Sequence, residues 1–190
     1  MTNAEIIVST LDSLLDHEVS LVLYGRAAIA LGFHSPPAEV GKSMDVDILL
    51  RFSDAPKLDP DDQFWDAQAE VNIRLEKQGL YMTHLFTEAQ VFLRPDWEQF
   101  IVPIDSVRLK WLRLHRPATI YLILTKMMRG DDRQDMDDVA FMIRHDKISS
   151  DQLEEAFTRV VIPDLQEYRD AFEKARRRVR EIVSRVMSDA

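Results

Sequence analysis

The stretch from Val19 to Arg51 constrains the fold of this chain most, because it changes its local structure several times within a short distance. Val19–Tyr24 is a short apolar run rich in strand-forming residues, and it ends at Gly25. A helix dominated by alanine is expected over Arg26–Leu31, followed by a proline-containing loop. Asp45–Arg51 then reads as a second strand. The stretch therefore predicts a strand, a glycine turn, a short helix and a second strand in close succession.

Two acidic residues interrupt the second of these strands. Side chains alternate along a strand, so Asp45 and Asp47 are expected on the same face, roughly 6–7 Å apart. Two neighbouring carboxylates repel each other unless a cation or a basic group lies between them. The glycine turn at Gly25 opens a helix, and a helix N-terminus favours anions. Together these features suggest a divalent metal held by Asp45 and Asp47, and a polyphosphate beside it. The alternative is an exposed strand start without a ligand.

The rest of the chain predicts an α+β fold, with a small mixed sheet followed by a C-terminal helical bundle. A first helix is expected over residues 3–16, with Asn3 as its cap. Further elements are expected as a helix over 63–78, strands over 81–86, 90–93 and 100–104, and helices from about Ser106 to the end. We expect an α/β core over residues 1–105 and a helical region over 106–190, packed as one compact unit.

Composition limits the classes of protein to which the chain can belong. It has 190 residues, no cysteine, five histidines without ligand-like spacing, and a formal net charge of −9. A disulfide framework and a thiolate metal site are therefore excluded, and a broad nucleic-acid-coating surface is not expected. The N-terminus lacks the pattern of a signal peptide, and no segment approaches the apolar length of a membrane span. These features predict a cytoplasmic protein without a membrane partner.

A second polar cluster lies in the C-terminal half. Lys126 falls in the most apolar helical segment, where an unpaired ammonium group would be unfavourable. It either extends outward to solvent or reaches an anion, such as a triphosphate or the Asp45–Asp47 pair. Further along, Asp135 can cap a helix over 136–145 with Asp138 at its third position, so both acids have a structural explanation as well as a functional one. Arg129 and Arg133 flank this segment and are candidates for phosphate contacts.

These two regions carry a resemblance to a known family. The segment Gly25-Arg-Ala-Ala-Ile-Ala-Leu, followed by Asp45-Val-Asp47-Ile-Leu-Leu, resembles the signature of the nucleotidyltransferase superfamily, which has a polymerase-beta-like fold. Residues 124–139, with Lys126, Asp135 and Asp138, resemble the later motifs of the AbiE-type toxin branch and its uncharacterised relatives. The resemblance covers about residues 19–145.

The resemblance implies Mg²⁺-dependent transfer of a nucleotidyl group from a nucleoside triphosphate to an acceptor, with two ions in the superfamily. Asp45 and Asp47 would hold the metal, and Gly25 would let the backbone approach the phosphates. Lys126 would stabilise the triphosphate, and Asp138, or less directly Asp135, would orient it or act as a base. The nucleotide-binding set that this implies comprises Gly25, Arg26, Lys126 and Arg129.

The sequence departs from the family pattern at two places. Arg26 stands where glycine or serine is usual, and an arginine can either bind a phosphate or block its approach. The strand after Asp47 has no acid at the position of the usual third carboxylate. His84 or Glu88 can take that place, or the third acid is absent. The departures favour the alternative of a catalytically degenerate fold that binds a nucleotide or a protein.

The resemblance also implies partners. The acceptor would be an RNA, such as tRNA, or a protein, and a toxin-like enzyme would have a cognate antitoxin-like protein. The last predicted helix is rich in basic residues, which form either a solvated helix face or, as the less favoured interpretation, a surface for an RNA acceptor. These basic residues are Lys174, Arg176, Arg177, Arg178, Arg180 and Arg185.

Overall fold

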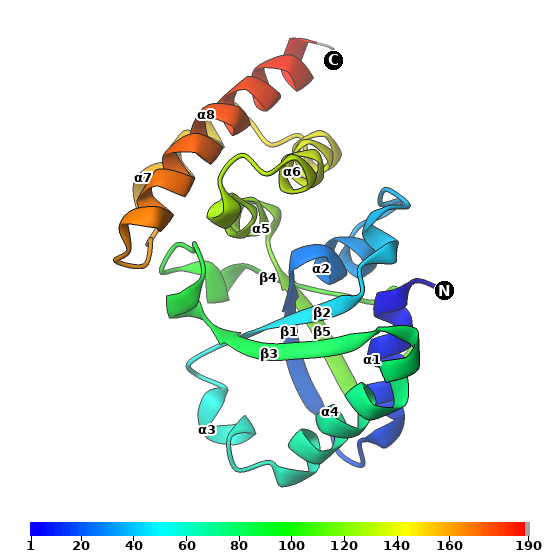
Figure 1. Cartoon of the computed structure of the whole chain (residues 1–190). Helices are drawn as coiled ribbons and strands as arrows, with labels where there is room; N and C mark the ends of the chain where they lie inside the picture. Colours follow the sequence, from blue (N-terminus) through cyan, green and yellow to red (C-terminus); the bar gives the residue numbers. More distant parts are fainter. Residues whose placement is uncertain (189–190) are drawn as a thin grey trace. The chain divides into compact units, whose positions relative to one another are not determined.

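The computed structural model describes residues 1–188 and shows an α+β protein, as the sequence predicts (Figure 1). The chain divides into two units, which are described separately. Unit 1 comprises residues 1–88 and 101–116, and unit 2 comprises residues 89–100 and the chain from Pro117 onward. This grouping differs from the expected boundary at residue 105, because the chain leaves unit 1 after residue 88 and then returns to it.

Unit 1 contains the sheet and four helices. Its strands are β1 (Val19–Tyr24), β2 (Asp45–Leu50), β3 (Tyr81–Thr87), β4 (Ile101–Pro103) and β5 (Leu112–Pro117), the last of which ends at the unit boundary. Its helices are α1 (Asn3–Leu14), α2 (Gly25–Gly32), α3 (Ala55–Leu58) and α4 (Asp62–Leu75). The predicted bounds of the first two strands and of the helix between them are therefore correct to within one residue.

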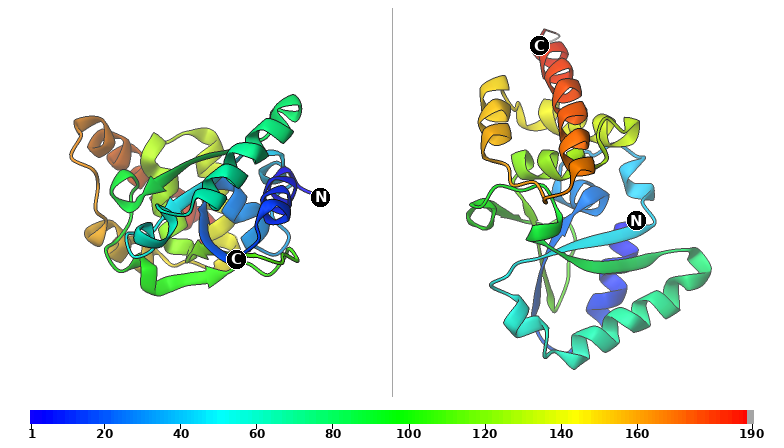
Figure 2. Two further views of the ribbon diagram at one scale, coloured as in Figure 1. Left: turned by 90° about the horizontal axis from the view of Figure 1, so that it is seen from below. Right: turned by 60° about the vertical axis from the view of Figure 1, so that its left-hand side comes forward.

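The five strands form one mixed sheet in the order β3-β2-β1-β5-β4. Figure 2 gives two further views of the ribbon. β2 is antiparallel to β1, with Tyr24 opposite Asp47, and parallel to β3, with Asp45 beside Tyr81. β1 is also parallel to β5. The register places Asp47 opposite the last residue of β1, and Asp45 beyond the end of that strand.

Helices α1, α2 and α4 pack against the sheet and bury its apolar side chains. Phe64 and Val71 of α4, which the sequence predicts as core residues, are fully buried, and Gly79 ends this helical stretch in the left-handed conformation. The expected cap of α1 is wrong. Thr2, rather than Asn3, caps the helix in a reciprocal arrangement with Glu5, since the threonine hydroxyl accepts the amide of Glu5 and the glutamate accepts the amide of Thr2.

The prediction of continuous helix from Ser106 is wrong over β5. Leu112 and Leu114 are buried while Arg113 is exposed, so this segment has the two-residue period of a strand. The start of β5 is held by Asp12 of α1. Its carboxylate accepts the backbone amides of Lys110, Trp111 and Leu112 at 2.9, 2.7 and 2.8 Å. A contact between residues about a hundred positions apart therefore fixes this strand, whose local alternation is too short to predict it.

Replacing Asp12 by alanine is expected to lower the free energy of unfolding by about 1–3 kcal/mol, because three amides lose their acceptor. Burial would raise the pKa of Asp12, but the three backbone hydrogen bonds and the charge of Arg113 lower it. Its contribution is therefore present above about pH 4 and is lost as the pH falls. Urea denaturation of the two proteins at pH 7 and pH 3 measures this. Asp66→Ala, at an exposed position of α4, is the control, and an equal loss in both variants would contradict the assignment.

Unit 2 consists of α5 (Thr119–Lys126), α6 (Arg133–Asp146), α7 (Ser150–Arg159) and α8 (Gln166–Ser188), together with the segment 89–100. The strand expected over Gln90–Leu93 is wrong, because only Leu93 pairs with another residue, Val161, in an isolated bridge. The segment is instead fixed by buried apolar residues and by Asp96. This carboxylate accepts hydrogen bonds from Arg94 at 2.8 Å, Tyr121 at 3.1 Å and Arg159 at 3.0 Å.

In the part of the chain that the structure describes, no helix is both long and apolar enough to cross a membrane.

Candidate active site

The Asp45–Asp47 pair lies where β1 ends and where β2 and β3 begin. Val46 and Ile48 point to the core and are fully buried, whereas the two aspartates alternate with them and are half-buried on the other face. The predicted placement of both carboxylates on one face is therefore confirmed by the burial pattern of the strand.

A hydroxyl group contacts each of the two carboxylates. Ser43 Oγ lies 2.7 Å from Asp45 Oδ1, and Thr83 Oγ1, on β3, lies 2.9 Å from Asp47 Oδ1. Sequence reasoning did not identify either residue, because a serine or threonine near an acidic pair is too common to be a signal. Both hydrogen bonds restrict the rotation of the aspartate side chains.

Gly25, the first residue of α2, touches the second of these acids. Its φ is +64°, in the left-handed region, and a Cβ atom at this position would lie 2.8 Å from Asp47 Oδ2. Any other residue would therefore collide with the carboxylate as well as strain the backbone. The glycine that the sequence pattern singled out is explained by close approach of the helix start to Asp47.

We expect Gly25→Ala to lower the free energy of unfolding by about 1–2 kcal/mol for the left-handed backbone, with a further loss because Asp47 must move. Gly79→Ala is the matched control, since Gly79 also has a positive φ, of +67°, but the methyl group would meet only the flexible end of Met44. Thermal or urea unfolding of both variants measures the difference. Equal losses would contradict the proposed contact between Gly25 and Asp47.

An aromatic residue that sequence reasoning missed also borders the pair. Burial, and then the charges of Asp47 and Asp45, raise the pKa of Tyr24 far above its ordinary value. Its hydroxyl therefore stays protonated at any physiological pH. The ring of Tyr24 meets that of Phe86 edge to face, with centroids 5.6 Å apart. In the sequence, the feature that could have indicated Tyr24 is its position directly before Gly25.

The donor set around Asp45 and Asp47 suits a magnesium ion. Mg²⁺ prefers oxygen ligands and is commonly held by one or two carboxylates, with water and substrate phosphates completing its shell. The backbone of Gly25 approaches Asp47 Oδ2 more closely than a residue with a Cβ atom would allow. Among the side chains that the structure describes, however, no group of three histidine, cysteine or acidic residues is placed to hold a metal. Glu88 is among the described side chains and does not join Asp45 and Asp47 in such a group. The side chain of His84 lies outside the described set, so its place at the third position stays a prediction.

Arg26 follows Gly25 in the first turn of α2. Its guanidinium donates to the carbonyl oxygen of Glu39, in the loop before β2, at 3.3 Å. The arginine therefore contacts the loop that connects α2 to β2. A contact of Arg26 with a phosphate stays a prediction.

In unit 2, Lys126, Asp135 and Asp138 form a buried ionic cluster, and the exposed side chain of Arg129 contacts it through Asp135. The ammonium nitrogen of Lys126 lies 3.0 Å from Asp135 Oδ1 and 2.8 Å from Asp138 Oδ2. Lys126, Asp135 and Asp138 are only 8, 4 and 3% exposed, respectively. The expectation that Lys126 reaches an anion is met by these two carboxylates, which connect the end of α5 to α6. Its approach to Asp45 and Asp47, which belong to the other unit, stays a prediction.

The capping role expected for Asp135 is wrong. Asp132 caps α6, because its carboxylate accepts the amide of Asp135 at 3.0 Å. The helix therefore starts three residues earlier than predicted, and the side chain of Asp135 is directed at basic groups. Arg129 Nε donates to Asp135 Oδ2 at 2.7 Å. Burial would raise the pKa of Asp135, but Arg129 and Lys126 outweigh it and lower the pKa.

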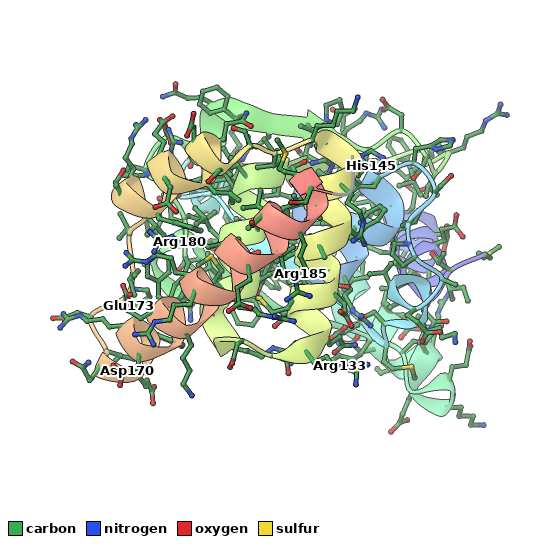
Figure 3. The ribbon with its side chains drawn as sticks, turned by 90° about the horizontal axis from the view of Figure 1, so that it is seen from above. Arg133, His145, Asp170, Glu173, Arg180 and Arg185 are labelled. Atoms are coloured by element: carbon green, nitrogen blue, oxygen red, sulfur yellow. The ribbon has the colours of Figure 1, made fainter. Side chains whose placement is uncertain are left out.

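The basic residues of α8 are largely engaged with acids of unit 2. Arg180 binds Glu154 of α7 through two hydrogen bonds of 2.6 Å, and Arg178 lies 2.7 Å from Glu181. Figure 3 shows Arg180 and Arg185 on the same helix as Glu173 and Asp170. The alternation of charges fits the favoured interpretation of a solvated helix face, and the RNA surface stays untested.

A hollow of about 470 Å³ lies in unit 1 near the start of β1 and the end of β2. His17 lies in its wall and is 2.8 Å from Asp61, and Arg51 in the same wall pairs with Asp54. No sequence motif pointed to this hollow. Glu18, also in the wall, pairs with Arg113, which lies outside it.

Comparisons with known proteins found no matching family model, no similar curated protein and no similar solved structure.

Proposed function

We propose that the chain is a Mg²⁺-dependent nucleotidyltransferase, which transfers a nucleotidyl group from a nucleoside triphosphate to an RNA or protein acceptor. The observation that supports it best is the contact of the glycine turn with the acidic pair. Asp45 and Asp47 share one face of β2, and the start of α2 approaches Asp47 as closely as a glycine allows. Few arrangements need an acidic pair and a side-chain-free helix start at the same place.

The two aspartates would hold the ion, and Gly25 would give phosphate oxygens access to the backbone at the start of α2. Bound Mg²⁺ would neutralise the charge that develops on the phosphates during transfer. Tyr24, which keeps its proton, can donate a hydrogen bond beside the carboxylates but cannot act as a base at neutral pH.

Roles in the same reaction are proposed for the cluster of unit 2. Asp135 and Asp138 hold the ammonium group of Lys126 in place, which suits a lysine that stabilises a triphosphate. Arg129 would support this arrangement through Asp135, and Arg26 would contact a phosphate from α2.

The test is transfer from each of the four nucleoside triphosphates labelled at the α-phosphate, with total RNA and total protein offered as acceptors. The proposal predicts covalent label in one acceptor class, release of pyrophosphate, and loss of both on addition of EDTA. Release of inorganic phosphate alone, or no label in either class, would contradict it.

A second candidate is a catalytically degenerate relative that binds a nucleotide or a protein. The observation that favours it is the lack of a third metal-binding group among the described side chains. Calorimetry with each nucleotide, with and without Mg²⁺, separates the two candidates. Tight metal-independent binding without turnover would favour the binding module over the enzyme.

A further inference from the structure

Thr83 lies on β3, next to the acidic pair, on the strand that carries no acid. Its Oγ1 atom is 2.9 Å from Asp47 Oδ1 and 3.1 Å from the carbonyl oxygen of Val46. A threonine hydroxyl has one hydrogen, so it can donate to only one of these acceptors at a time. The charged carboxylate is the stronger acceptor. The hydrogen bond to Asp47 is therefore the favoured one.

Two contacts on opposite sides fix the rotation of the Asp47 carboxylate. Thr83 binds Oδ1, and Oδ2 lies against Gly25, at 2.8 Å from the place where a Cβ would be. The partner acid is restrained in the same way, since Ser43 donates to Asp45 Oδ1 at 2.7 Å. When a group that hydrogen-bonds to a metal ligand is removed, the metal affinity typically falls by about tenfold to a hundredfold.

Thr83 adds a hydrogen-bond donor to the site but no charge. We propose that Thr83 is a positioning residue that orients Asp47 toward a divalent cation, an inference that rests on the proposed function. Thr83 therefore differs in role from the third carboxylate that is usual in the superfamily, because it orients one carboxylate instead of supplying another.

The test is a titration of the full chain with Mn²⁺, in which free Mn²⁺ is measured by electron paramagnetic resonance. Thr83→Val keeps the shape of the side chain but removes the donor, and is expected to weaken Mn²⁺ binding about tenfold or more. Thr83→Ser restores the hydroxyl and is expected to restore the affinity. Thr83→Ala, with the same expected loss, is the second variant should valine disturb the strand.

The outcomes separate this inference from the proposed function. Unchanged affinity in both Thr83→Val and Thr83→Ala would overturn the inference while the ion still depends on Asp47. No Mn²⁺ binding by the wild type, or undiminished binding by Asp47→Asn, would overturn the proposed function together with the inference. Circular dichroism of each variant establishes that the fold is intact.

Discussion

Nucleotidyl transfer is expected to fall by at least about a hundredfold when Asp47 is replaced by asparagine, since metal stabilisation of the transferred phosphate contributes several kcal/mol. Asparagine has nearly the same shape and keeps an oxygen that can accept the hydrogen bond from Thr83. The substitution therefore removes the negative charge with little change in packing. Asp45→Asn is expected to have an effect of the same order, because both carboxylates are proposed as ligands.

The stability of the same variants provides an internal check. Urea denaturation of each variant and of the wild type shows whether a loss of activity is accompanied by a loss of stability. Asp66→Asn, on the exposed side of α4, is the control for loss of an acid elsewhere in unit 1.

The activity of all these variants is measured as the rate of transfer of α-labelled nucleotide at saturating Mg²⁺. Wild-type rates in both Asp45→Asn and Asp47→Asn would contradict the assignment of the pair.

The second large effect is expected in unit 2. Lys126→Met should lower the free energy of unfolding by about 3–5 kcal/mol, which is typical when one partner of a buried ion pair is removed. Methionine fills most of the space but leaves Asp135 and Asp138 without the ammonium group that both bind. Arg129 still contacts Asp135, so the loss at Asp135 should be partly offset.

A double variant tests this explanation. Lys126→Met combined with Asp138→Asn removes the buried charge together with its partner, and we expect it to recover part of the lost stability. Lys174→Met, on the exposed side of α8, is the matched control and should change stability by less than about 0.5 kcal/mol. Urea denaturation followed by circular dichroism measures all three variants. A loss below about 1 kcal/mol in Lys126→Met would contradict the buried ionic cluster.

The pH dependence of the wild type should agree with this account. The lowered pKa of Asp135 means that its contribution to stability is present above about pH 4 and is lost as the pH falls through the folded-state value. The Lys126→Met variant should lose part of this dependence, because one of the two cations that lower the pKa of Asp135 is removed.

The sequence predicted the first part of unit 1 well for a physical reason. A short apolar run that stops at a glycine has few alternatives, and acids that alternate with Val46 and Ile48 can only lie on the other face of a strand. Both signals are local, so they survive without knowledge of the tertiary structure.

The misses have non-local or degenerate causes. β5 depends on Asp12, a residue about a hundred positions away, and its alternation of buried and exposed residues is too short to identify a strand. Around Asp135 several acids compete for one cap, and propensity does not distinguish them; packing against Lys126 decides the choice. Thr83 and Ser43 were not predicted, because hydroxyl residues near an acidic pair have no characteristic spacing. The placement of Asp45 and Asp47 on one face was therefore predictable, whereas the hydroxyl groups that contact them were not.

A crystal structure of the chain with Mn²⁺ and a non-hydrolysable nucleoside triphosphate tests the central claim most directly, because anomalous scattering locates the ion without assumptions. The account predicts an ion bound by the carboxylates of both Asp45 and Asp47, with the triphosphate attached to it beside Gly25. An ion and a nucleotide bound elsewhere, with Asp45 and Asp47 contacting neither, would contradict it.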